Sequence, residues 1–241
     1  MCKVLDQFYD LKSFPMWWEQ IPEHFRSHCK FVSIADLEIN ESVRQLRDLY
    51  VQRFDAERVN KRIPEQNWKR ADICRHIVPP NLPVLDIGSG LGEFVNLFAI
   101  GNPTTPIASV DLKDYDLWFD ASGRIERIYK SIFYLSSNEA RDVVTCFEVI
   151  EHLPPARLAE AVVILRSLAK QKLFVSVPFM EPLPLYKGHF TRFDTELLEK
   201  LFPDARFTIF GKGGRSANKV LAWIMCEIDI KQETALKGTR S

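Results

Sequence analysis

The chain has 241 residues, of which 46% are hydrophobic, and its 32 basic residues balance 32 acidic ones to a formal net charge of zero. This composition predicts a globular protein with a full core and argues against nucleic acid as a partner, because proteins that bind phosphate backbones usually carry a basic excess. No apolar stretch reaches the ~20 residues that span a bilayer, no signal peptide opens the chain, and the five scattered cysteines form no C-x-x-C pair, so we expect a cytoplasmic protein.

Residues 1–75 read as a helical N-terminal cap or lid. Asn40 can cap a helix whose apolar positions recur every three or four residues, and a second helix is predicted over residues 64–77. The aromatic run Phe14-Pro15-Met16-Trp17-Trp18 precedes both. These aromatic side chains either cover the core or form a wall over a substrate.

After Pro83 the pattern changes to short apolar runs that alternate with helices, including one over residues 155–169. Such alternation predicts a parallel sheet covered by helices on both faces. Asp194 can cap a further helix, with Phe193 packing onto Leu198. The expected strands are Val84 to Ile87, Ile107 to Val110, Asp142 to Phe147, Lys172 to Val177, Phe207 to Phe210 and Val220 to Ile228, the last two antiparallel because the loop between them is short. Residues 231–241 are expected to be a flexible tail.

The stretch Val84-Leu85-Asp86-Ile87-Gly88-Ser89-Gly90-Leu91-Gly92 is the most informative part of the chain. An apolar strand ends in an acid and then in a G-x-G-x-G turn, which lets the backbone approach a ligand closely. The spacing differs from the dinucleotide and P-loop motifs. Asp111 follows the next strand, where its carboxylate could accept hydrogen bonds from both hydroxyls of a ribose.

These motifs resemble those of the class I S-adenosylmethionine-dependent methyltransferases. VLDIGSGLGEF is similar to their first motif, SVDL to their second, and DVVTCFEVIEHL to the fourth-strand motif of ubiquinone-pathway and sugar or natural-product O-methyltransferases. The resemblance covers about residues 76–230, the predicted methyltransferase domain. It implies a Rossmann-like, doubly wound, seven-stranded, mostly parallel sheet with an antiparallel last strand.

The resemblance also implies S-adenosylmethionine as the cofactor and assigns roles to its binding residues. The glycine turn would contact the methionine part, Asp86 would orient that turn or meet the amino group, and Asp111 would hold the ribose. Leu112 would flank the adenine. The implied cofactor-binding set is Asp86, Gly88, Ser89, Gly90, Gly92, Asp111, Leu112, Cys146 and Phe147. The acid that usually follows the third strand has no clear counterpart, with Asp116 and Asp120 as candidates.

Methyl transfer to a hydroxyl needs a general base near neutrality, which histidine suits. His152 and His189 both follow strand ends on the expected side of the sheet and are the candidate catalytic residues. Alternatively, Glu148, Glu151, His152 and His189 could hold a divalent cation that acidifies the hydroxyl, because residues three and four apart on a helical turn face the same way. The favoured set contains no metal ligand.

The expected reaction is O-methylation of a small molecule or of a sugar unit in a glycan. Trp17, Trp18, Phe179 and Tyr186 hint at an apolar or ring-stacking pocket, although each could equally be a core residue. Two other functions stay open. One is a metal-assisted RNA ribose 2′-O-methyltransferase, and the other is a non-catalytic binding subunit with a methyltransferase-like fold.

Overall fold

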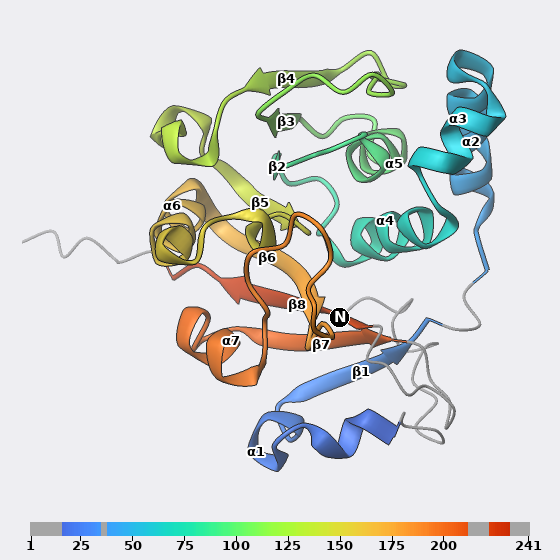
Figure 1. Ribbon diagram of the computed structural model, residues 1–241. Helices are drawn as coiled ribbons and strands as arrows, with labels where there is room; N and C mark the ends of the chain where they lie inside the picture. The colour runs from blue at the N-terminus through green and yellow to red at the C-terminus, as the bar shows by residue number, and fades with distance from the viewer. Residues whose placement is uncertain (1–15, 35–37, 212–221, 232–241) are drawn as a thin grey trace, which may run out of the picture.

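The computed structural model describes residues 16–34, 38–211 and 222–231. An eight-stranded mixed sheet runs through the molecule in the order β1-β7-β8-β6-β5-β2-β3-β4 (Figure 1). All neighbouring strands are parallel except β8, which is antiparallel to both β6 and β7. The predicted doubly wound α/β fold with an antiparallel last strand is therefore confirmed. The strands are β1 Cys29–Ser33, β2 Val84–Ile87, β3 Ile107–Asp111, β4 Ile125–Tyr129, β5 Arg141–Phe147, β6 Ala169–Phe179, β7 Arg206–Gly211 and β8 Ala222–Asp229.

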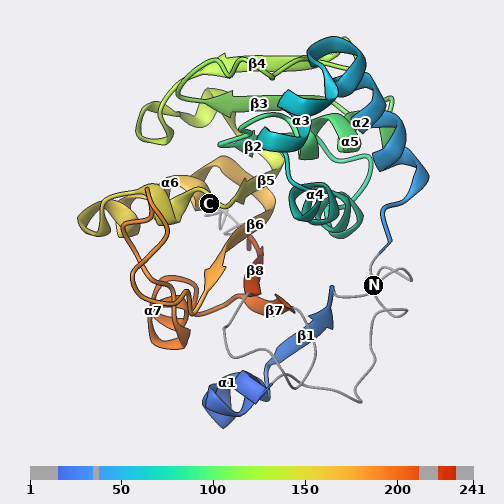
Figure 2. The same ribbon diagram turned by 45° about the vertical axis from the view of Figure 1, so that its right-hand side comes forward.

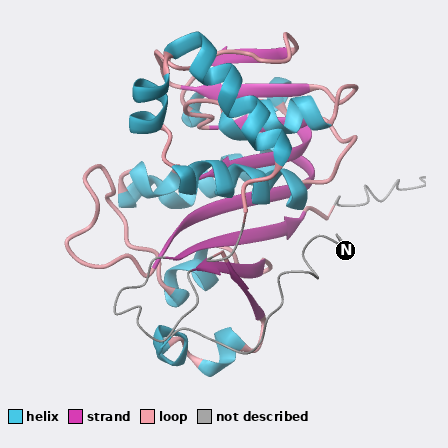
Figure 3. Ribbon diagram, turned by 90° about the vertical axis from the view of Figure 1, so that its right-hand side faces the viewer, coloured by secondary structure: helices cyan, strands magenta, loops and turns pink. Residues whose placement is uncertain are grey.

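Helices cover both faces of the sheet (Figures 1 and 3). One face carries α2 Glu41–Phe54, α3 Ala56–Arg62, α4 Glu65–Ile77 and α5 Glu93–Gly101; the other carries α6 Leu158–Leu168 and α7 Thr195–Leu201, with α1 Glu23–Arg26 beside β1. Short 3-10 helices are η2 Met16–Gln20, η3 Ile132–Tyr134, η4 Ser137–Glu139, η5 Ile150–His152 and η6 Pro155–Arg157. The two helical layers enclose two separate hydrophobic clusters, one on each side of the sheet. Among the described residues no helix is both long and apolar enough to span a membrane.

The elements with strong local signals lie where the sequence places them. β2 begins and ends at the predicted residues, and its four residues are all buried. Asn40 caps α2 by accepting a hydrogen bond from the backbone N–H of Val43 at 3.0 Å. Asp194 caps α7 in the same way through the N–H of Leu197. The predicted helix over residues 155–169 begins as the 3-10 turn η6 and becomes α-helical only at Leu158.

The leading segment is not wholly helical. β1 lies within it and pairs in parallel with β7, so the sheet has an eighth strand beyond the seven expected (Figure 2). Trp17 and Trp18 pack edge-on against Phe31 of this strand, with ring centroids 5.8 and 5.4 Å away, and both indoles are buried. These two tryptophans therefore cover the core at the edge of the sheet. Phe14 and Pro15 lie outside the described residues, as do the whole β7–β8 loop, with the first two residues of the strand predicted over 220–228, and residues 232–241.

Candidate functional site

The site lies where the chain reverses its direction of travel across the sheet. From β2 the chain moves outward through β3 and β4, and it then returns to β5 and continues through β6 on the other side. β2 and β5 are parallel neighbours, so their carboxyl ends meet at one edge. A doubly wound sheet binds ligands at this switch point. The glycine turn follows β2 there, and Glu148 follows β5.

Positive φ angles shape the glycine turn. Gly88, Gly90 and Gly92 have φ values of 75°, 54° and 90°, which glycine adopts without the steric cost of a side chain. A Cβ on Gly88 would lie 2.3 Å from Cγ2 of Val149, so any side chain at this position would force Val149 or the turn to shift. Gly92 forms the left-handed N-cap of α5.

Asp111 ties the turn to the end of β3. Its Oδ2 accepts a hydrogen bond from the N–H of Gly90 at 3.0 Å, and its Oδ1 accepts one from the N–H of Leu112 at 2.7 Å. The carboxylate is buried, and each oxygen keeps a further lone pair for another donor. This geometry suits a ligand that bears neighbouring hydroxyls.

The hydroxyl groups of Ser89 and Ser109, together with Arg127, hold the glycine turn against β3 and β4. Ser109 of β3 donates to the hydroxyl of Ser89 at 2.6 Å, and Nη1 of Arg127 donates to both hydroxyls. The Arg127 guanidinium also stacks over the ring of Trp118, with its Cζ 4.4 Å from the ring centroid. Arg127 was not among the residues predicted from the sequence, because the half-polar strand β4 that carries it was not predicted.

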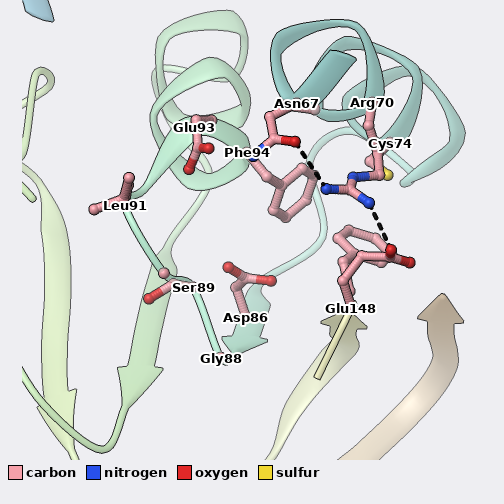
Figure 4. A pocket seen from close by; sticks show the side chains of 13 residues that line it. Asn67, Arg70, Cys74, Asp86, Gly88, Ser89, Leu91, Glu93, Phe94 and Glu148 are labelled. Atoms are coloured by element: carbon pink, nitrogen blue, oxygen red, sulfur yellow. Dashed lines mark hydrogen bonds and ion pairs between the residues drawn. The ribbon is translucent and has the colours of Figure 1, made fainter. Parts of the chain in front are cut away.

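A pocket of about 240 Å³ opens between the turn and α4 (Figure 4). α4 contributes one face of the helix, with residues spaced three and four apart. The turn, the start of α5 and the end of β5 form the other walls. The lining residues are Asn67, Arg70, Ala71, Cys74, Asp86, Gly88, Ser89, Gly90, Leu91, Glu93, Phe94, Phe147 and Glu148.

Buried carboxyl groups dominate the electrostatics of this pocket. Burial raises the pKa of Asp86 to about 7, although the Thr145 hydroxyl donates to its Oδ1 at 2.7 Å and opposes the shift. Burial likewise raises the pKa of Glu93, whose carboxylate is hydrogen-bonded by the Asn67 side chain. A bound cation would stabilise the ionised form of both groups.

Arg70 and Glu148 form an ion pair across the pocket. Nη1 of Arg70 lies 2.5 Å from Oε2 of Glu148, and Nη2 donates to Oδ1 of Asn67 at 3.1 Å (Figure 4). The hydroxyl of Ser176 donates to the other oxygen of Glu148 at 2.9 Å. Both charged side chains are mostly buried, so this pair has a fixed place in the pocket wall.

Three further candidate residues form a cluster beyond Glu148. Ligand atoms of Glu151, His152 and His189 all lie within 4.8 Å of one another. Nδ1 of His152 is 2.9 Å from the carbonyl oxygen of Gly188, and Nδ1 of His189 is 2.7 Å from Oε2 of Glu181. A carbonyl and a carboxylate can only accept, so each Nδ1 carries a proton, and Nε2 is the atom of each ring that can offer a lone pair.

Glu151 supplies a buried acid to the same cluster. Burial and the neighbouring Glu148 carboxylate raise its pKa, and its Oε2 has no hydrogen-bond partner among the described residues. Oε1 lies 3.9 Å from Nε2 of His152. Sequence reasoning missed Glu181, which orients His189, since nothing in its local sequence marks it.

Comparisons with known proteins identify the fold. No family model matches the chain, and no curated protein matches it. Solved structures do match. Magnesium protoporphyrin IX methyltransferase from Synechocystis, solved with S-adenosylhomocysteine, is 18% identical over 79% of this chain and 100% of its own, with a TM-score of 0.54.

Two further structures agree. The 1,6-didemethyltoxoflavin-N1-methyltransferase of Burkholderia thailandensis is 16% identical over 81% of this chain and 92% of its own, with a TM-score of 0.54. An S-adenosylmethionine-dependent methyltransferase from Archaeoglobus fulgidus is 16% identical over 71% and 97%, with a TM-score of 0.57. The chain has the class I methyltransferase fold.

Within this methyltransferase fold, only part of the predicted cofactor set lines the pocket. Asp86, Gly88, Ser89, Gly90 and Phe147 do so. Of the others, Asp111 and Gly92 shape the turn as described above. Leu112 is 72% exposed beside Asp111, and Cys146 is fully buried in the core.

The four proposed metal ligands do not come together as expected. Glu148 precedes η5 and has a left-handed backbone with φ of 57°, so it does not share a helical face with Glu151. Its carboxylate turns to Arg70 instead. Glu151, His152 and His189 do form one group.

Neither candidate for the third-strand acid is free for an adenine. The Asp120 carboxylate accepts hydrogen bonds from the N–H groups of Ser122, Gly123 and Ile125, and thereby shapes the turn before β4. Asp116 pairs with two arginines, one on α3 and one at its end. Both acids have local structural roles.

Of the four residues proposed for a ring-stacking pocket, some lie in the core and one lies at the surface. Phe179 is fully buried and stacks on Phe25 with centroids 6.3 Å apart, so it belongs to the core together with the two tryptophans. Tyr186 is 71% exposed, and its ring centroid lies 5.5 Å from that of His189. Of the four, Tyr186 alone lies beside the histidine cluster.

Proposed function

We propose that this protein is an S-adenosylmethionine-dependent methyltransferase that methylates a hydroxyl group of a small molecule or of a sugar unit. The observation that carries the proposal is the pocket at the switch point, with the glycine turn, Asp86 and Asp111 around it. Acidic groups at the pocket match the ammonium and sulfonium charges of the cofactor. Asp111 has acceptor capacity for the ribose diol.

The reaction would be an in-line displacement. Held by the glycine turn, Asp86 and Asp111, S-adenosylmethionine would supply its methyl carbon to the acceptor oxygen; the electron pair of the broken carbon–sulfur bond would stay on sulfur, and S-adenosylhomocysteine would leave. The enzyme contributes mainly by holding the two reactants in line. The acceptor proton passes to Nε2 of His152 or His189, the ring nitrogen that each of the two hydrogen-bonding patterns leaves available.

The surroundings of the histidines favour an acceptor with an apolar or ring-shaped part. Leu183, Tyr186 and Phe190 are 76%, 71% and 61% exposed on the loop that carries His189. Exposed apolar side chains gathered around a site indicate contact with a ligand. A hydroxyl on such a ring system would meet both the apolar loop and the imidazoles.

Calorimetry with S-adenosylhomocysteine tests the proposal without a known acceptor. We expect micromolar binding by the wild type and a loss of about tenfold or more in Asp111→Ala, which removes two charge-assisted acceptors. Asp116→Ala is the matched control, since Asp116 pairs with arginines outside the pocket. An absence of binding at millimolar ligand would refute the enzyme and leave the non-catalytic binding subunit.

The second candidate function is metal-assisted RNA ribose 2′-O-methylation, and the Glu151, His152 and His189 group favours it. Each histidine donates its Nδ1 proton to an acceptor, as metal-bound histidines commonly do, and Oε2 of Glu151 has no hydrogen-bond partner in residues 16–34, 38–211 and 222–231. These three residues would hold a divalent cation, which would acidify a hydroxyl bound beside it. The balanced charge of the chain does not favour RNA.

Titration with Mn²⁺ separates this candidate from the first. If the metal is used, the wild type binds Mn²⁺ and His189→Ala loses most of that affinity, while His24→Ala on α1 does not change it. Wild-type protein that does not bind millimolar Mn²⁺ would contradict the metal-assisted candidate.

A further inference from the structure

The pocket beside α4 has an imbalance of charge. Of its described lining residues three are acidic, namely Asp86, Glu93 and Glu148, and Arg70 alone is basic. The proposed cofactor brings two positive groups and one negative group. The acids account for the ammonium and the sulfonium, which leaves the carboxylate in need of a cation.

The position of Arg70 fits that need. It stands on the face of α4 that Asn67, Ala71 and Cys74 share, and this face is the wall opposite the glycine turn (Figure 4). The pocket does not include Asp111 or Leu112, which lie on the nucleoside side of the turn. It is therefore the space for the amino-acid end of the cofactor.

The present partners of Arg70 allow it to accept a second anion. Nη1 is committed to Glu148, which Ser176 holds from the other side. Within the part of the chain that the structure describes, the hydrogen-bond partner of Nη2 is the neutral amide oxygen of Asn67 at 3.1 Å. A carboxylate is a stronger acceptor than an amide, so it would displace Asn67 from Nη2 while the Glu148 pair stays in place.

We propose that Arg70 binds the α-carboxylate of S-adenosylmethionine, with Glu148 as the positioning residue that fixes its guanidinium. This inference rests on the proposed function. It gives the leading segment of the chain a direct role, since α4 then completes the cofactor site. Glu148 acts here as an anchor for Arg70.

The test compares two ligands that differ only in the carboxylate, S-adenosylmethionine and its decarboxylated form, by calorimetry. We expect the wild type to bind S-adenosylmethionine about 10- to 100-fold more tightly than the decarboxylated ligand. In Arg70→Met the ratio of the two affinities falls to one or below, because the remaining acids then repel the carboxylate. Arg70→Lys restores part of the ratio.

Two variants control for structural effects. Arg75→Met removes another ion-paired arginine of α4, one that pairs with Asp72 rather than lining the pocket, and leaves the ratio at its wild-type value. Arg70→Met/Glu148→Gln removes both charges of the buried pair and keeps the protein folded if an unpaired Glu148 destabilises the single variant.

Each outcome is decisive. A wild type that binds both ligands equally well overturns the proposal, and so does an Arg70→Met variant that weakens both ligands by the same factor, because Arg70 is then structural. A wild type that binds neither ligand refutes the proposed function itself. Failure of the inference alone is thus distinguishable from failure of the function.

Discussion

Asp86 shows how one buried carboxyl group couples ligand binding to protons. Its pKa of about 7 exceeds the ordinary aspartate value of 3.8, so the folded protein binds a proton there more tightly than the unfolded chain does. The contribution of Asp86 to the free energy of unfolding therefore falls as pH rises from about 4 to 7. Above pH 7 the full cost of the buried charge is present.

This shift predicts proton release on cofactor binding. The ammonium of S-adenosylhomocysteine would favour the ionised carboxyl, so at pH 6 binding releases a proton from Asp86, and the affinity falls as the pH is lowered. Calorimetry in two buffers of different ionisation enthalpy measures the released protons. Asp86→Asn abolishes the release at pH 6, and neither protein releases protons through this group at pH 8.5. Equal release by both proteins at pH 6 would exclude Asp86 as the source.

The glycine turn permits a matched comparison of two residues. Gly88→Ala places alanine at an unfavourable positive φ and brings its Cβ into contact with the Val149 side chain. Gly90→Ala has the unfavourable φ alone, since nothing lies within 4 Å of its added Cβ. We expect Gly90→Ala to cost about 1–2 kcal/mol of stability and Gly88→Ala about 1–3 kcal/mol more. Urea unfolding measures both. Equal costs would mean that Val149 yields freely.

Single residues are predictable from sequence when their signal is local. The G-x-G-x-G turn and Asp86 lie within a few positions of one another, so their spacing alone points to a ligand site. Arg70 pairs with Glu148, which lies 78 positions further along the chain, so no local sequence pattern indicates the pair. Such residues become visible only when the sheet brings their strands and helices together.

At the scale of elements, the loop between β6 and α7 depends on one carboxylate. Glu181 accepts from the N–H of Tyr186 at 2.8 Å through Oε1 and from His189 through Oε2, so it closes the loop on itself. The loop backbone is further held by Phe190, whose N–H donates to the carbonyl oxygen of Glu151 at 2.8 Å.

Removal of Glu181 should therefore loosen the loop without unfolding the protein. We expect Glu181→Ala to raise the rate of tryptic cleavage after the exposed Lys187 by roughly tenfold, because local opening no longer breaks two hydrogen bonds. Limited proteolysis followed by mass spectrometry gives the rate. The control variant Glu196→Ala, on α7, should be cleaved by trypsin at the wild-type rate. An unchanged rate for Glu181→Ala would show that the Phe190 contact is sufficient.

The strands that can be predicted from the sequence differ from the others in how many apolar residues follow one another. β2 and β3 are buried along their whole length, and β5 and β6 are buried along their central residues, so all four contain a mainly apolar run. β4 and β1 have half-polar sequences, IERIY and CKFVS, because each is an edge strand. Their hydrogen bonds to β3 and β7 decide their conformation, and pairing between distant segments is not encoded in a short window.

At the scale of the molecule, the leading helices and the sheet form one unit. The hydroxyl of Tyr50 on α2 donates to the carbonyl oxygen of Leu91 at 2.6 Å and accepts from Asn96 of α5. Trp68 of α4 packs edge-on against Tyr50, with centroids 5.3 Å apart. The glycine turn therefore rests on helices of the segment that the sequence marked only as a cap or lid.

This arrangement predicts where the cofactor will stabilise the protein. S-adenosylhomocysteine should slow amide hydrogen exchange in residues 65–77 and 88–96 and leave β1 and α7 unchanged, because the first two ranges contain pocket-lining residues and β1 and α7 contain none. Exchange read by mass spectrometry, with and without ligand, tests this. Slowing of the glycine turn without any change in α4 would remove that helix from the site.

The pairing of β1 with β7 has a consequence for biosynthesis. Cys29 lies opposite Phe207, so β1 is synthesised long before the strand that pairs with it. The intervening loop is long, and its closure must await the nearly complete sheet. Until then β1 is an unpaired strand, and β7 emerges with an open edge. Closing that edge would be among the last steps by which the nascent chain becomes resistant to aggregation.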